Sequence, residues 1–120
     1  MSSSPQWVYK QAFGEYPSKD SIILKSDYEF SSNETTIVLK FKTDDIHKFL
    51  AYYPRLIPIT QEIFKKQLTS HLPYWFNPLE NLPSKFYSAS LYADSNPDTE
   101  ILLSYNSESG LVYFSYYSFD

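Results

Sequence analysis

The side chains that most often bind metals are sparse in this chain. His47 and His71 are the only histidines, and there is no cysteine. Neither histidine belongs to a His-x-x-x-His pair or another short ligand spacing. Asp44 and Asp45 precede His47 closely, but carboxylates at the start of a helix are explained by the exposed backbone N–H groups there. We therefore predict no metal site and no cofactor.

Patterns for nucleophilic catalysis and phosphate binding are also missing. The chain has no Gly-x-Ser-x-Gly turn, and with only Gly14 and Gly110 it cannot build a glycine-rich phosphate loop. Its serines are plentiful, but a serine needs a convergent base and oxyanion donors to act as a nucleophile. A pair of carboxylates can meet from any distance along the chain, so an enzyme with a carboxylate-based site stays an alternative. We favour a non-catalytic protein.

Aromatic residues are the most distinctive group, with 12 Tyr, 9 Phe and 2 Trp in 120 residues. The segment 72–83 combines three prolines with an aromatic triplet, which is too apolar for a solvated loop. Rigid Tyr and Trp rings are enriched in protein interfaces, so we predict a recognition surface here. The alternative is that Trp75 simply covers the open face of a sheet. The candidate binding residues are Tyr74, Trp75, Asn77, Glu80, Tyr87 and Tyr117.

Charge and hydropathy limit the kinds of partner that this chain is expected to bind. The net charge is −4, and Lys and Arg are scattered along the chain without forming a stripe, which argues against nucleic acid. No run approaches the roughly 18 apolar residues of a membrane-spanning helix. We expect a protein partner, with a small molecule or carbohydrate as the alternative ligand.

Hydrophobic periodicity predicts the elements of the first half. Residues 36–42 alternate as a strand with one buried side, and short apolar pieces in 20–31 precede it. Thr43 is the expected N-cap of a helix over 44–53, which Pro54 ends. Thr60 is the expected N-cap of a second helix that runs to about Ser70 or His71. In the last turn of this helix, the His71 imidazole would interact favourably with the helix dipole.

The second half predicts an antiparallel meander of strands 85–93, 100–105 and 111–119. Gly110 should take a positive φ in the second turn. Both faces of 111–119 are apolar, which indicates a central strand covered by helices on one side and the proline-rich segment on the other.

The expected fold class is α+β, a small two-layer sandwich. Its antiparallel sheet has about five strands, in the order strand, strand, helix, helix and three strands, with both helices on one face. Residues 1–120 form a single domain with a flexible tail at 1–6. The predicted core consists of Ile37, Leu39, Phe41, Phe49, Leu50, Ile63, Leu68, Leu103 and Phe114.

The layout resembles that of small bacterial proteins of unknown function, among them immunity proteins against secreted toxins. The resemblance implies a protein-interaction or inhibitor module and carries over no residues. The polar start, residues 1–6, lacks the apolar region of a signal peptide, which favours the cytoplasm. The alternative is an exported or lipoprotein-like domain whose signal sequence is missing from this chain.

Overall fold

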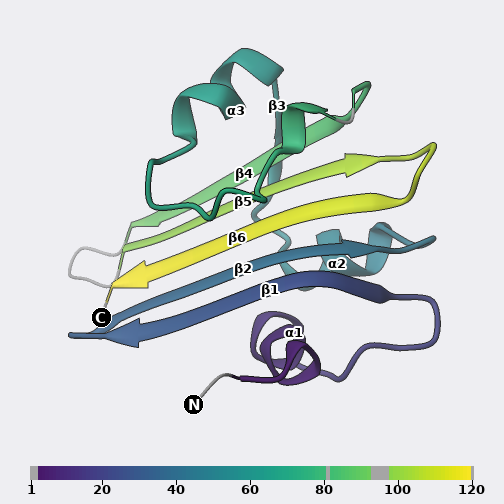
Figure 1. Cartoon of the computed structure of the whole chain (residues 1–120). Coiled ribbons are helices and arrows are strands. Elements are labelled where there is room, and N and C mark those ends of the chain that lie inside the picture. The colour runs from purple at the N-terminus through teal and green to yellow at the C-terminus, as the bar shows by residue number, and fades with distance from the viewer. Residues whose placement is uncertain (1–2, 81, 93–97, 120) are drawn as a thin grey trace.

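The chain folds around one antiparallel six-stranded sheet with the strand order β1-β2-β6-β5-β4-β3 (Figure 1). The computed structural model describes residues 3–80, 82–92 and 98–119. The strands are β1 (Ile22–Ser31), β2 (Glu34–Lys42), β3 (Ile57–Ile59), β4 (Lys85–Tyr92), β5 (Asp98–Asn106) and β6 (Leu111–Phe119). The helices are α1 (Pro5–Phe13), α2 (His47–Tyr52) and α3 (Gln61–Gln67), with a 3-10 turn η1 (Pro78–Glu80). The predicted α+β class and single domain are confirmed.

The predicted meander and its central strand are also confirmed. β4, β5 and β6 pair in sequence, and β6 lies between β5 and β2. Gly110 has a φ of 75° in the β5–β6 turn, and a Cβ there would come within 2.7 Å of the Thr43 carbonyl oxygen. Both the backbone conformation and the close approach require glycine. The predicted turn at 94–98 and the end of the 85–93 strand fall mostly on residues 93–97, outside the described residues.

One face of the sheet, here called the helix face, carries α1 and α2. Side chains at alternate positions of the strands point to the same face, which places Leu39, Phe41 and Phe114 together under the helices. Phe13 of α1 and Phe49 of α2 meet edge to face, with ring centroids 4.7 Å apart. The main core is therefore an aromatic cluster between the helix face and these two helices.

The opposite face, here called the loop face, carries α3 and the proline-rich segment. Phe64 of α3 packs on Phe86, with centroids 4.7 Å apart, and Phe76 packs edge-on against Tyr113 at 5.4 Å. The two helices expected on one face thus lie on opposite faces, and the second helix on the helix face is α1. The cause is β3, which pairs with β4 at the sheet edge and lets the chain pass from α2 around that edge to α3.

Helix α1 corrects the expected flexible tail. The Ser4 hydroxyl accepts a hydrogen bond from the Trp7 amide at 3.2 Å, and Pro5 occupies the first turn, where its missing N–H costs nothing. Gly14 ends the helix with a φ of 78°. Pro5 and Gln6 therefore lie in a helix that buries Val8 and Tyr9, while residues 1–2 lie outside the described residues.

The two predicted helices are shorter than expected. α2 begins only at His47 because the residues before it form a turn. The hydroxyl of the buried Thr43 accepts a hydrogen bond from the Asp45 amide. The Asp45 carboxylate in turn accepts a hydrogen bond from the His47 amide. Thr60 is confirmed as an N-cap, since its hydroxyl accepts from the Ile63 amide at 3.2 Å. α3 ends at Gln67, so the expectation that His71 closes this helix is wrong.

Most of the predicted core is buried. Leu50 and Leu68 are only partly buried, and Ile63 is 45% exposed because its neighbour Phe64 takes the inward position of this short helix. The buried members of the predicted set are Ile37, Leu39, Phe41, Phe49, Leu103 and Phe114.

Truncation of Phe114 tests this core. Phe114→Ala should lower the free energy of unfolding by about 3 to 5 kcal/mol, because the ring is fully buried against Phe13 of α1 and Tyr53. The exposed Ile63→Ala variant is the control and should cost less than about 1 kcal/mol. Urea unfolding measures both changes, and equal losses would contradict the assignment.

Tyr53 links the two helices of the helix face. Its hydroxyl donates a hydrogen bond to the Ala12 carbonyl at the end of α1, and its ring stacks on Phe114. Burial raises the pKa of Tyr53 above the usual tyrosine value, and the neighbouring Tyr52 and Tyr116 act in the same direction. Burial also raises the pKa of Tyr9 beneath α1.

The raised pKa values of Tyr53 and Tyr9 predict a loss of stability at alkaline pH. A phenol with a raised folded-state pKa contributes stability below the unfolded value of about 10, and this contribution disappears as the pH rises beyond it. Tyr53→Phe should cost about 1 kcal/mol at neutral pH through the lost hydrogen bond, yet partly flatten the alkaline decline. Urea midpoints between pH 7 and pH 11 measure this, with the exposed Tyr74→Phe as control. An unchanged alkaline slope in Tyr53→Phe would refute the role of this phenol.

Candidate functional site

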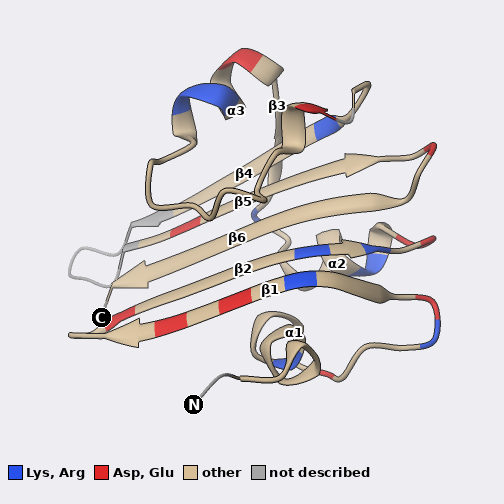
Figure 2. Ribbon diagram, viewed as in Figure 1, with Lys and Arg blue, Asp and Glu red and all other residues tan. Residues whose placement is uncertain are grey.

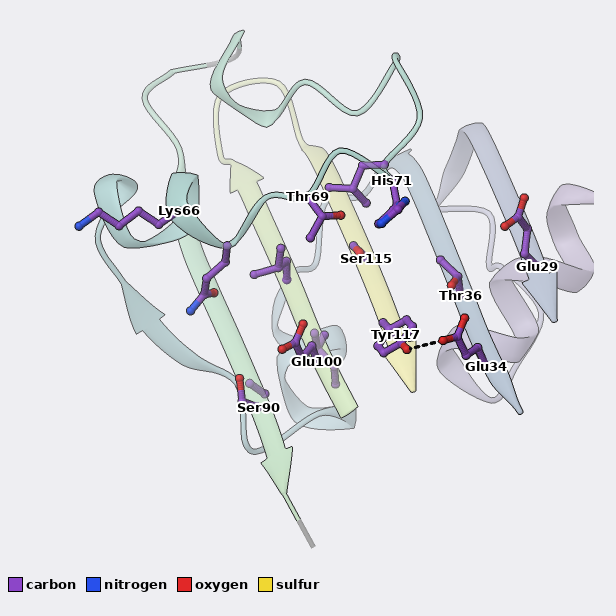
Figure 3. A pocket seen from close by; sticks show the side chains of 15 residues that line it. Glu29, Glu34, Thr36, Lys66, Thr69, His71, Ser90, Glu100, Ser115 and Tyr117 are labelled. Carbon is purple, nitrogen blue, oxygen red and sulfur yellow. Dashed lines mark hydrogen bonds between the residues drawn. The ribbon is translucent and has the colours of Figure 1, made fainter. Parts of the chain in front are cut away.

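A groove of about 690 Å³ lies on the loop face, where the proline-rich segment stops covering the sheet (Figure 3). Its floor comes from the ends of β2, β4, β5 and β6, and Glu29 of β1 lies at its outer side. Its wall comes from the end of α3 and the loop that follows, residues 66–72. The groove therefore joins side chains from five strands, the end of α3 and the loop that follows this helix.

Strand register places a polar row across the groove floor. Residues directly opposite each other in paired strands share a face, so successive cross-strand partners form a continuous line. Glu100 and Glu29, near the two ends of this line, are three strand spacings apart, or about 14 Å. The row, in order from β4 to β1, is Ser90, Glu100, Tyr117, Thr36 and Glu29.

Glu34 adds a third carboxylate beside this row. The Tyr117 hydroxyl donates a hydrogen bond of 3.0 Å to Glu34 Oε1, as the dashed line in Figure 3 shows. A hydroxyl donor to a carboxylate holds that group in place without removing its negative charge. Glu34 remains exposed, so its other lone pairs stay accessible to a ligand.

The groove has an acidic character. Glu29, Glu34 and Glu100 are all exposed, whereas Lys66, the one lysine among the described residues of the groove lining, extends away from the other labelled side chains (Figure 3). His71 and Thr69 approach from the loop above β6. The electrostatic field of the groove therefore favours a positively charged ligand.

The described residues contain no group of three or more His, Asp or Glu side chains that could hold a metal ion. His71 lies in the groove on the loop face, whereas His47 begins α2 on the helix face, so the sheet separates the two imidazoles. The polar groups that the groove presents are carboxylates, hydroxyls and the His71 imidazole, with the amide of Gln67 and the ammonium of Lys66 at its wall.

The predicted aromatic segment divides into a buried and an exposed part. Trp75 is partly buried and packs against the cluster that contains Val38, Phe76 and Tyr113, so it covers the sheet. Tyr74 is 86% exposed and presents almost its whole ring to solvent. Asn77 and Glu80 are exposed around η1, beside Tyr74 along the chain.

The other two predicted binding residues lie apart from this segment. Tyr117 lines the groove on the loop face, which places it on the same side of the sheet as Trp75. Tyr87 packs against the main core on the helix face, directly opposite Leu103. The sheet therefore separates Tyr87 from the other candidates, and the six residues do not form one patch.

Comparisons of the chain with protein-family models, curated proteins and solved structures find no match. Among the described residues, no helix has the length and apolar character needed to cross a membrane. The function of the groove has to be inferred from its own residues.

The groove carboxylates were missed by sequence reasoning. Glu29, Glu34 and Glu100 come from three strands, and only the register brings them to one place. A partial signal exists in β2, where Glu34 and Thr36 continue the polar side of an alternating strand. Such alternation shows which residues share a face, but not which strands pair.

The two halves of the aromatic segment should respond differently to truncation. Trp75→Ala should cost about 2 kcal/mol of unfolding free energy because its ring is partly buried against the sheet. Tyr74→Ala should stay within about 0.5 kcal/mol of the parent protein. Chemical denaturation followed by circular dichroism measures both. A neutral Trp75→Ala variant would show that this ring does not cover the sheet.

Proposed function

We propose that this protein is a non-catalytic binding module that holds a positively charged segment of a protein partner in the groove of the loop face. The observation that carries the proposal is the row of polar side chains with a carboxylate near each end and a third beside it. Charge complementarity of this kind contributes more to specificity for the partner and to the association rate than to affinity.

Exposure of the carboxylates supports binding of Lys or Arg side chains. Glu29, Glu34 and Glu100 are accessible from the groove, and hydrogen bonds between a cation and a carboxylate are stronger than neutral ones. The floor between them carries hydroxyl groups from Thr36 and Tyr117, which suit the polar backbone of a bound peptide. The groove therefore matches a basic peptide better than an apolar one.

The distance between the outer carboxylates supports an extended peptide. Glu100 and Glu29 are separated by about 14 Å, and an extended chain rises about 3.4 Å per residue. Basic side chains four positions apart in such a chain span the same distance, and Glu34, on β2 between these two strands, can contact a basic side chain between them. The ligand of the groove is therefore an extended segment with basic residues at alternate positions.

The aromatic segment supports this module in two ways. Trp75 covers the sheet next to the groove, and Leu72 of the same segment lines the groove wall. The exposed Tyr74 and Asn77 of the same segment provide contact area for the remainder of a partner. The rigid prolines of the segment lower the entropy lost on binding.

Binding of the labelled peptide Lys-Thr-Lys-Thr-Lys, followed by fluorescence anisotropy, tests the proposal. We expect saturable binding that weakens with salt. Glu100→Gln and Glu34→Gln should each weaken binding about fivefold, corresponding to about 1 kcal/mol per lost ion contact.

Glu62→Gln is the matched control. It makes the same change of charge on an exposed position of α3 outside the groove lining, and should leave the affinity unchanged. An equal loss in all three variants would mean that only the net charge attracts the peptide. That result, or an absence of binding at low salt, would refute the groove as the recognition site.

A further inference from the structure

A second cavity lies on the helix face, between the end of α1 and α2. Its volume of about 310 Å³ is at the small end of the range for ligand pockets in proteins. The sheet separates it from the groove, which opens on the loop face. The residues that line it are Phe13, Gly14, Glu15, Lys48, Phe49 and Tyr52. Three of these six residues are aromatic, so the cavity suits a small ligand with a flat apolar part.

Aromatic rings form the floor and the outer wall of this cavity. Phe13 and Phe49 belong to the main core and form the floor. Tyr52 is 50% exposed and packs edge to face against Phe13, with ring centroids 6.3 Å apart. Its ring can approach the end of α1 closely because residue 14 is glycine, where a Cβ would lie 2.9 Å from the Tyr52 hydroxyl oxygen. A ligand ring between floor and wall can therefore contact aromatic groups on two sides.

Lys48 brings a positive charge to the cavity. It is the basic position of α2, drawn blue in Figure 2, and its ammonium lies 5.2 Å from the centroid of the Phe49 ring. The ammonium contacts the Ser18 hydroxyl at 3.4 Å and the Glu15 carboxylate at 3.7 Å. Both contacts are long, and the Glu15 side chain is 66% exposed, so neither holds the ammonium tightly. An ammonium has three N–H donors, and Lys48 therefore keeps donors for a ligand.

Two buried hydroxyl groups beside Lys48 have no hydrogen-bond partner in the described part of the chain. They are the phenol of Tyr9, which is fully buried, and the Oγ of Ser21, which is 8% exposed. Burial raises the pKa of the Tyr9 phenol, and the Ser21 side chain and the Lys48 ammonium act in the opposite direction, so the three groups are neighbours. Buried polar groups of folded proteins are nearly always paired. The two hydroxyls therefore have donor capacity that a bound ligand can use.

The three neighbouring groups favour a carboxylate as the polar part of a ligand. Each of them can donate a hydrogen bond, and a carboxylate offers two oxygens with about four lone-pair positions. Its single negative charge matches the ammonium of Lys48, and hydrogen bonds between charged groups are stronger than neutral ones. The chain's own carboxylate at Glu15 approaches Lys48 from an exposed position, so the ammonium is accessible to this chemical group.

We propose that this cavity binds a small aromatic carboxylate. The carboxylate accepts hydrogen bonds from Lys48, Tyr9 and Ser21, and it replaces Glu15 at the ammonium. The ring of the ligand lies against the aromatic floor and the outer wall. This site does not depend on the proposed peptide groove, because the two lie on opposite faces of the sheet.

Titration with benzoate, followed by nuclear magnetic resonance of the labelled protein, tests the proposal. Benzoate should shift the backbone amides of residues 13–15 and 48–52 and leave those of the groove floor unchanged. Benzyl alcohol keeps the ring without the charge, and acetate keeps the charge without the ring. Each should bind at least about tenfold more weakly than benzoate. Equal affinities for benzoate and acetate would mean that Lys48 attracts any anion. That result, or an absence of saturable benzoate binding, would overturn the proposal.

Substitutions of the three donors locate the carboxylate. Lys48→Met, Tyr9→Phe and Ser21→Ala should each weaken benzoate binding about fivefold. Glu15→Gln should strengthen it about twofold, because the competing carboxylate is removed. Lys65→Met removes a positive charge from α3 on the loop face, and as the control for Lys48→Met it should leave the affinity unchanged.

The stability of the free protein separates a binding role of the two hydroxyls from a structural one. Tyr9→Phe and Ser21→Ala remove groups that make no hydrogen bond in the described part of the chain, so their urea midpoints should match that of the parent protein. A clear loss of stability in either variant would show that its hydroxyl already has a partner. Parent-like affinity for benzoate in both variants would show that the hydroxyls do not reach the ligand. Either result contradicts the proposed site.

Discussion

Burial of β6 on both of its faces is the constraint on which the rest of the structure depends. Val112 and Phe114 point to the helix face and require α1 and α2 above them, whereas Leu111 and Tyr113 require cover on the loop face. The proline-rich segment supplies that cover through Phe76 and Trp75. The groove lies further along β6, at Tyr117, where this cover stops.

The sheet was largely predictable because its strands carry strong local patterns. The alternation in 36–42 and the apolar run 111–119 identified β2 and the central β6 without knowledge of pairing. Helix α1 was missed because its signals, a serine cap and a closing glycine, enclose a single short helix. The opposite placement of α2 and α3 was not predictable, since it depends on the three-residue strand β3 at the sheet edge.

The candidate site, like the fold, was only partly predictable from local sequence patterns. Local composition identified the segment of Tyr74 and Trp75, and it also found Tyr117, but it could not assign a sheet face to Tyr87. The carboxylates of the groove are distant in sequence and meet only through the register of β1, β2, β6 and β5. The acidic character of the groove thus arises from tertiary structure, whereas the aromatic residues mainly build the surfaces around it.

The most direct measurement of the central claim is a nuclear magnetic resonance titration of the labelled protein with a lysine-rich extended peptide. Binding in the groove should shift the backbone amides of Thr36, Glu100 and Tyr117, which share the floor, and leave those of α1 and α2 unchanged. Shifts confined to the helix face, or spread evenly over the acidic surface, would contradict the account.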